Sequence, residues 1–191
     1  MYRIILLIAL LPIAAALAAR WWFGTRVLAE DGGHPCRSDL SNWLPAPGDE
    51  SIVHRAEESA DEFGRQLRLK ALADWRAQDP KAAASREGAR RFGLAVPPLS
   101  GVIAIFALVV GKVPVMGALA IFLAATALAA LIGMLTLPPE LAAIHRAAKK
   151  TRETRCFPDR DDEDAVIRCA AAHAWDAALP PILRLIGKSG S

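Results

Sequence analysis

The sequence has little of what nucleic-acid-binding proteins carry. Its 23 Lys and Arg barely exceed its 20 Asp and Glu, its one tyrosine is Tyr2, and no basic stripe is interleaved with aromatic residues. Its three cysteines, Cys36, Cys156 and Cys169, have neither CxxC spacing nor a paired histidine, so they do not predict a zinc knuckle. We therefore predict no nucleic-acid partner.

Charge is missing from two long blocks of the chain. Residues 4–19 contain no charged side chain, and Lys112 is the only ionisable residue in 92–137. Uncharged segments of this length match the roughly 20 residues that cross about 30 Å of hydrocarbon. The pattern predicts an all-α integral membrane protein with an N-terminal anchor (1–23) and a transmembrane helical hairpin (92–137), and hence the lipid bilayer as a partner.

The first apolar segment can be read in two ways. As a retained anchor it is short, but Arg20 can snorkel, and Trp21, Trp22 and Phe23 can anchor its end at the interface. As a secretory signal peptide it offers the cleavage pattern Ala-Leu-Ala at 16–18. We expect a retained anchor, because two tryptophans are poor residues to follow a cleavage site.

The second block predicts a tight hairpin. Residues 111–114, Gly-Lys-Val-Pro, interrupt it and leave two spans of roughly 20 residues each. We expect the two spans to be antiparallel and in contact, because the second is rich in small residues that allow close approach of helices. These are Gly117, Ala118, Ala120, Ala124, Ala125, Ala127, Ala129, Ala130 and Gly133. Pro97 and Pro98 are expected to kink the first span.

The polar segments form the rest of the chain. In 24–91 we expect a loop followed by a charged helix over 52–75 whose apolar face includes Phe63, Leu67 and Ala71. In 138–191 we expect a basic helix, an acidic turn and an Ala-rich helix with a kink at Pro180 and Pro181. The acidic residues 159–164 lack the spacing of a calcium loop and suggest a solvated helix start.

Basic residues predict the orientation. They gather on the face that carries the 20–91 segment and the C-terminal tail, whereas the other face has only Arg3 and Lys112. By the positive-inside rule, the large loop and the tail are cytoplasmic in a bacterial-type inner membrane, crossed more than once. All three cysteines then lie on the cytoplasmic side as reduced thiols, and a Cys156–Cys169 disulfide needs the reverse orientation.

The region 115–186 resembles the C-terminal half of a family of membrane-embedded neutral zinc metallopeptidases. In that family a long apolar helix ends in a motif like T-L-P-x-E-F-N-A-S-R-R-A, before an acidic turn and an Ala-rich helix. This chain has LTLPPELAAIHRA and later DEDAVIRCAAAHAWDAAL. The residues that match the motif are Thr136, Leu137, Pro138, Glu140, Ala143, Arg146 and Ala147.

The resemblance implies a zinc site, but most of the ligands of that site and its general base are missing from this sequence. It would make Glu140 the third zinc ligand, beside two histidines of an HExxH helix that precedes the hairpin. HExxH is absent from this chain, and Ser85 and Ala89 would stand at the ligand positions, with Arg86 where the base belongs. We therefore expect no zinc and no other cofactor, with Glu140 paired to Arg146 or His145 or hydrated at the interface.

Other polar residues allow alternative readings. His54 and Glu58, four apart on the expected helix, could join Glu140 in a zinc site, or could be a solvated pair. His173 and Asp176 share a helix face and could be functional at membrane depth, or simply hydrated at a surface.

The favoured function is a non-catalytic membrane protein on a degenerate metallopeptidase-like scaffold. It would act as an accessory, regulatory or assembly factor with other membrane proteins as partners. The alternatives are an active zinc metallopeptidase with unrecognised ligands and a small membrane immunity or stress protein.

Overall fold

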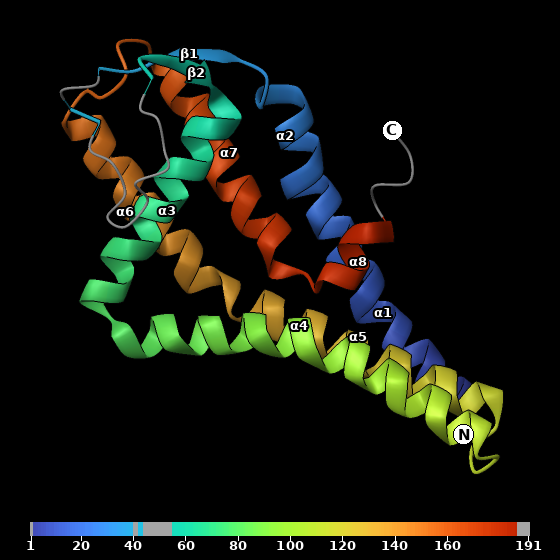
Figure 1. Cartoon of the computed structure of the whole chain (residues 1–191). Coiled ribbons are helices and arrows are strands. Elements are labelled where there is room, and N and C mark those ends of the chain that lie inside the picture. Colours follow the sequence, from blue (N-terminus) through green and yellow to red (C-terminus); the bar gives the residue numbers. More distant parts are fainter. Residues whose placement is uncertain (1, 40–41, 44–54, 187–191) are drawn as a thin grey trace. The chain divides into compact units, whose positions relative to one another are not determined.

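The computed structural model describes residues 2–39, 42–43 and 55–186 (Figure 1). The chain divides into two compact units that alternate along the sequence. The apolar unit comprises residues 1–19, 85–137 and 177–191, and the polar unit comprises 20–84 and 138–176. In the described part every long element is a helix, which confirms the predicted all-α fold class.

The apolar unit is built from helices that could cross a membrane. α1 (Tyr2–Arg20) buries Leu6, Ala9, Ile13 and Ala16, a stripe with the three- and four-residue spacing of one helix face. α4 (Pro80–Val109) and α5 (Val115–Leu135) follow, and the short α8 (Pro181–Ile186) lies near the C-terminus. Three helical stretches among the described residues are long and apolar enough to span a bilayer: Leu6–Asp31, Pro80–Val109 and Val115–Glu153.

The predicted hairpin is confirmed. α4 and α5 run side by side (Figure 1), and a Cβ built on Gly101 of α4 would lie 3.4 Å from the ring of Phe122 on α5. The turn between them contains Gly111 at φ 72°, a conformation that glycine adopts without strain. The buried residues of α5 are almost all small, as expected for close helix contact: Gly117, Ala118, Ala120, Thr126, Ala127, Ala129, Ala130 and Gly133. Pro97 and Pro98 lie inside α4, which continues through them.

The polar unit differs from the expectation at its start. The first helix continues past Arg20 through a π-helical turn, η1 (Trp21–Thr25), and α2 (Arg26–Asp31). The region expected to be loop contains β1 (Pro35–Arg37), which pairs antiparallel with β2 (Glu57–Ser59). The charged helix α3 (Ala60–Gln78) therefore begins at Ala60, because Ser59 is its N-cap and its hydroxyl accepts a hydrogen bond from Glu62 N at 3.3 Å. Of the expected helix 52–75, residues 52–54 lie outside the described residues.

The core of the polar unit forms where α3 meets the C-terminal helices. Phe63, Leu67 and Ala71 are buried on α3, as the periodicity predicted. Phe63, Trp43 and Phe157 make three edge-on ring contacts with centroids 5.3–5.5 Å apart. The Trp43 indole N–H, which would be costly to bury alone, donates to Gln66 Oε1 at 3.0 Å.

Two further helices complete the polar unit. α6 (Leu137–Glu153) is the expected basic helix, and α7 (Arg160–Ala178) is the expected Ala-rich helix. α7 ends before Pro180 and Pro181, where a kink was predicted, and α8 begins at Pro181. α3 and α7 approach so closely that a Cβ on Gly64 would lie 2.6 Å from Cys169 Cβ.

Candidate functional site

Glu140, which the resemblance implies as a zinc ligand, lies in the first turn of α6 and is 1% exposed. The expected partners His145 and Arg146 are exposed on the same helix. Glu140 is paired with a basic residue, as expected, but this residue is Arg68 of α3 and neither His145 nor Arg146. The difference arises from tertiary packing, because α3 lies against the face of α6 that carries Glu140 and places the Arg68 guanidinium beside it.

The Arg68–Glu140 ion pair is short and largely excluded from water. Arg68 Nε and Nη2 lie 2.8 and 2.7 Å from Glu140 Oε1, and the Arg68 side chain is 16% exposed. A zinc ion bound to this oxygen would sit about 2.0–2.2 Å from it, within the space that the guanidinium occupies. Two cations cannot share one carboxylate oxygen at such distances without strong repulsion.

The positions that the resemblance assigns to the metal helix lie on α4, in the apolar unit. Ser85 is exposed and Ala89 is buried, and neither side chain is a usual zinc ligand. Arg86 is buried, and its Nη1 donates to the Gly133 carbonyl at 2.8 Å and to Thr136 Oγ1 at 2.9 Å. A guanidinium has only donors and stays protonated, so Arg86 ties α4 to the end of α5 and cannot act as a general base.

The alternative ligand pair, His54 and Glu58, was predicted from a helix that the structure does not contain at Glu58. Glu58 lies in β2, with its Oε2 3.7 Å from Arg55 Nη1 and its Oε1 accepting from Ser59 N at 3.4 Å. His54 lies outside the described residues. The prediction that the two share a helix face is wrong, because pairing with β1 extends the backbone at Glu58.

His173 and Asp176 on α7 are both engaged in ion pairs. His173 Nε2 lies 2.9 Å from Asp61 Oδ1, and Asp176 Oδ1 accepts from Arg20 Nε at 2.8 Å. Phe23 stacks on Trp175 between these contacts, with centroids 5.0 Å apart. These residues fasten α7 to α3 and to the end of α1, which is a structural role.

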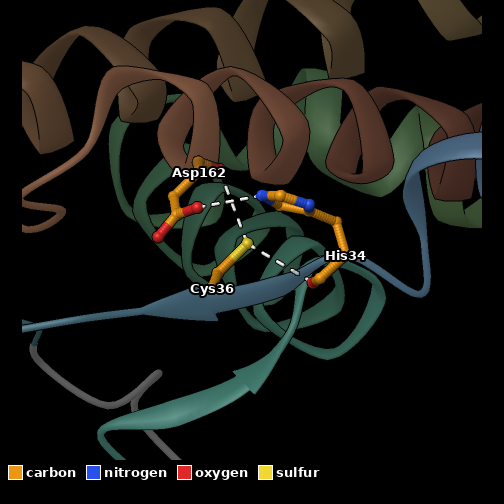
Figure 2. Close-up of side chains that lie close together, drawn as sticks. All are labelled: His34, Cys36 and Asp162. Atoms are coloured by element: carbon orange, nitrogen blue, oxygen red, sulfur yellow. Dashed lines mark hydrogen bonds and ion pairs between the residues drawn. The ribbon is translucent and has the colours of Figure 1, made fainter.

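A cluster of three potential metal donors forms at the start of α7 (Figure 2). His34 precedes β1, Cys36 lies within β1, and Asp162 lies in the first turn of α7. His34 Nε2 and Asp162 Oδ1 are 3.0 Å apart, and one donor atom from each of the three residues lies within 4.8 Å of the others. The backbone N–H of Arg37 donates to Asp162 Oδ2 at 3.0 Å and orients the carboxylate.

Burial controls the chemistry of the cysteines. Cys36 is 2% exposed, and burial together with the nearby Asp162 carboxylate raises the pKa of its thiol to about 12. Burial, followed by the charges of Asp61 and Asp31, raises the pKa of Cys169 to about 12. Both side chains are therefore thiols at neutral pH, and all three cysteines are free and buried.

The acidic residues at the start of α7 are less solvated than expected. Asp162 and Glu163 are buried, and Glu163 Oε1 accepts from Arg152 Nε at 2.6 Å. Arg152 also pairs with Asp164, and hydrogen bonds to these carboxylates raise the pKa of its guanidinium. The prediction of a solvated helix start holds for the exposed Asp159, Asp161 and Asp164. It fails for Asp162 and Glu163, because Asp162 is bonded to the β1 backbone and Glu163 to Arg152 of α6.

Comparison with known proteins identifies no relative. No family model, no curated protein and no solved structure matches this chain. The resemblance to zinc metallopeptidases stays a prediction.

Sequence reasoning missed the two constellations that the polar unit assembles. Arg68 and Glu140 are 72 positions apart, and His34 and Asp162 are 128 apart, so no local pattern connects them. A partial signal for the second was present: His34 and Cys36 are two residues apart, a spacing that places both side chains on one face of an extended segment.

Proposed function

We propose that this chain is a non-catalytic membrane protein that acts through interactions with other membrane proteins, as an accessory, regulatory or assembly factor. The observation that carries the proposal is the Arg68–Glu140 ion pair. It neutralises the one carboxylate that the resemblance would give to zinc. On this view a positive side chain has replaced a positive metal ion, and an inherited scaffold is kept for its shape.

The energetics of the pair support this proposal. Removing one partner of a buried ion pair leaves an uncompensated charge and costs about 3–5 kcal/mol. A cation on Glu140 Oε1 would have to displace Arg68, whose guanidinium contacts that oxygen at 2.7 Å. Zinc hydrolysis further requires a base beside a metal-bound water. Arg86 stands at the position where the resemblance places the base, and it has no acceptor atom.

The location that we propose is a bacterial-type inner membrane, crossed more than once. Three helices suited to crossing a bilayer support the membrane part of the proposal. The gathering of Lys and Arg on the segments around 20–91 and 146–155 supports a cytoplasmic position for the large loop and the tail.

The proposal is tested by assaying peptidase activity in the full-length protein, purified in detergent and supplemented with zinc. We expect unfolded protein and peptide substrates to be cleaved no faster by the wild type than by Glu140→Gln. A contaminating protease would act equally in both preparations, so the variant serves as the control. Cleavage that is present in the wild type and lost in Glu140→Gln, while circular dichroism shows the variant to be folded, would establish the active zinc metallopeptidase instead.

A further inference from the structure

The cluster of His34, Cys36 and Asp162 combines the three side-chain types that bind borderline divalent ions. An imidazole nitrogen, a thiol sulfur and a carboxylate oxygen converge from β1, the residue before it, and the first turn of α7 (Figure 2). We propose that these three residues form a zinc site, with water as the fourth ligand. This site is separate from Glu140, and it revises the sequence-based expectation of a zinc-free protein.

The geometry of the cluster is close to what zinc requires. Bonds of about 2.0–2.3 Å at tetrahedral angles separate neighbouring ligand atoms by about 3.3–3.6 Å. His34 Nε2 and Asp162 Oδ1 are already 3.0 Å apart, and the sulfur of Cys36 completes a triangle whose sides are at most 4.8 Å. A shift of the sulfur by about 1 Å would therefore close the site, and a rotation of roughly 35° about χ1 of Cys36 can supply it.

The bonds that the thiol would give up are weak. Cys36 Sγ lies 3.6 Å from the His34 carbonyl and 3.8 Å from the Asp162 carbonyl, long contacts for a weak donor. Because the second contact comes from the backbone of α7, the sulfur already faces the helix that carries Asp162. Zinc would replace these contacts and the His34–Asp162 hydrogen bond with three direct bonds, and the proton of the Cys36 thiol would be released to water.

The charges of the three donors suit a divalent ion in a buried place. Cys36 is 2% exposed, so an isolated thiolate beside the Asp162 carboxylate would be strongly disfavoured. Zn²⁺ with one thiolate, one carboxylate and one neutral imidazole forms a unit of zero net charge, which can be buried at little cost. The His34 side chain is 45% exposed, so the ion and its water ligand would be reached from that side.

The surroundings hold the donors in place. Pairing of Cys36 with Glu58 fixes the direction of β1, and the Arg37 N–H holds the second oxygen of Asp162. Such outer contacts orient metal ligands in known sites. An ion here would join the segment after α2 directly to α7, and so would act as a structural clamp within the polar unit.

The experiment uses the full-length protein in detergent, stripped of metal with a chelator and titrated with Zn²⁺ against a chromophoric competitor. We expect one ion per chain and a rise in thermal stability. Replacing zinc with Co²⁺ should produce a thiolate-to-cobalt charge-transfer band that reports Cys36 directly. His34→Gln and Cys36→Ser should each weaken binding by more than the roughly 10–100-fold that loss of an outer contact costs.

Three matched variants separate this site from other sources of binding. Cys156→Ser and Cys169→Ser remove buried thiols outside the cluster and should leave the cobalt band unchanged. Glu140→Gln, measured under conditions in which circular dichroism shows it to be folded, should also keep the ion, so the zinc site and the non-catalytic proposal can fail independently. His34→Gln keeps a polar, half-exposed side chain, which makes it the variant least prone to unfold.

Two results would overturn the inference. One is a folded wild-type protein that retains no Zn²⁺ and shows no cobalt band, which would leave His34 and Asp162 as an ordinary ion pair beside a buried thiol. The other is stoichiometric zinc whose affinity is unchanged in both His34→Gln and Cys36→Ser, which would place the ion elsewhere.

Discussion

At the scale of single residues, paired charges connect the helices of the polar unit. Arg68–Glu140 is the most enclosed pair described here, whereas on α7 the acidic partners Asp176 and Asp61 are 34% and 49% exposed. Buried pairs stabilise little compared with apolar side chains of equal volume, yet they make the loss of either partner severe.

The Arg68–Glu140 pair leads to a prediction about stability. Glu140→Gln should lower the free energy of unfolding by about 3–5 kcal/mol, because it leaves the Arg68 guanidinium buried without its counter-charge. The same change at Glu30, whose pair with Arg26 is exposed, should cost no more than about 0.5 kcal/mol. Thermal or denaturant unfolding in detergent, followed by circular dichroism, measures both.

A double variant tests the contact itself. Arg68→Met/Glu140→Met should lose less free energy of unfolding than the sum of the losses of Arg68→Met and Glu140→Met, and strict additivity would contradict the assigned contact.

At the scale of the elements, small residues determine how closely the helices approach. A Cβ on Gly64 would meet Cys169 Cβ at 2.6 Å and Ala170 N at 2.8 Å, so α3 and α7 touch along their backbones at this point. Neither atom can move away easily, because one is the Cβ of a buried side chain and the other is a backbone nitrogen of α7. Close contact of this kind also explains why α7 contains so many alanines on its buried face.

Two helical glycines should therefore respond oppositely to the same substitution. Gly64→Ala should destabilise the protein by about 1–3 kcal/mol through overpacking, despite the better helix propensity of alanine. Gly88→Ala on α4 should be neutral or stabilising by up to about 1 kcal/mol, because nothing lies within 4 Å of its added Cβ. Melting temperatures of the two purified variants test this pair. Equal effects at both positions would mean that α3 and α7 are farther apart than described.

At the scale of the whole molecule, the orientation in the membrane decides which compartment the polar unit meets. The native cysteines are poor reporters of this, because Cys36 and Cys169 are buried and their thiol pKa values are raised to about 12. Thiolate is the reactive form, so both should label slowly at neutral pH. An introduced cysteine at an exposed position is a better probe.

The predicted orientation can be tested by labelling single introduced cysteines with a membrane-impermeant maleimide. On the positive-inside assignment, Glu57→Cys in β2 should react only after the cells are opened, because that segment is cytoplasmic. Lys112→Cys at the exposed tip of the hairpin should react in intact cells and serves as the matched control. The reverse pattern would place the large loop outside and would reopen the question of a Cys156–Cys169 disulfide.

The sequence by itself determined the helical class, the hairpin and the buried face of α3, because each depends on the composition or periodicity of about 20 neighbouring residues. Only the tertiary structure decided that Glu140 meets Arg68, that Glu58 lies in a strand, and that His34, Cys36 and Asp162 converge. These outcomes depend on how residues that lie 22 (Cys36 and Glu58), 72 (Arg68 and Glu140) and 128 (His34 and Asp162) positions apart are brought together, and no local pattern encodes the free energy of such contacts. The same reason explains why Asp162 and Glu163 were wrongly expected to be solvated. Their burial depends on contacts with β1 and with Arg152 of α6, which lie outside the acidic turn.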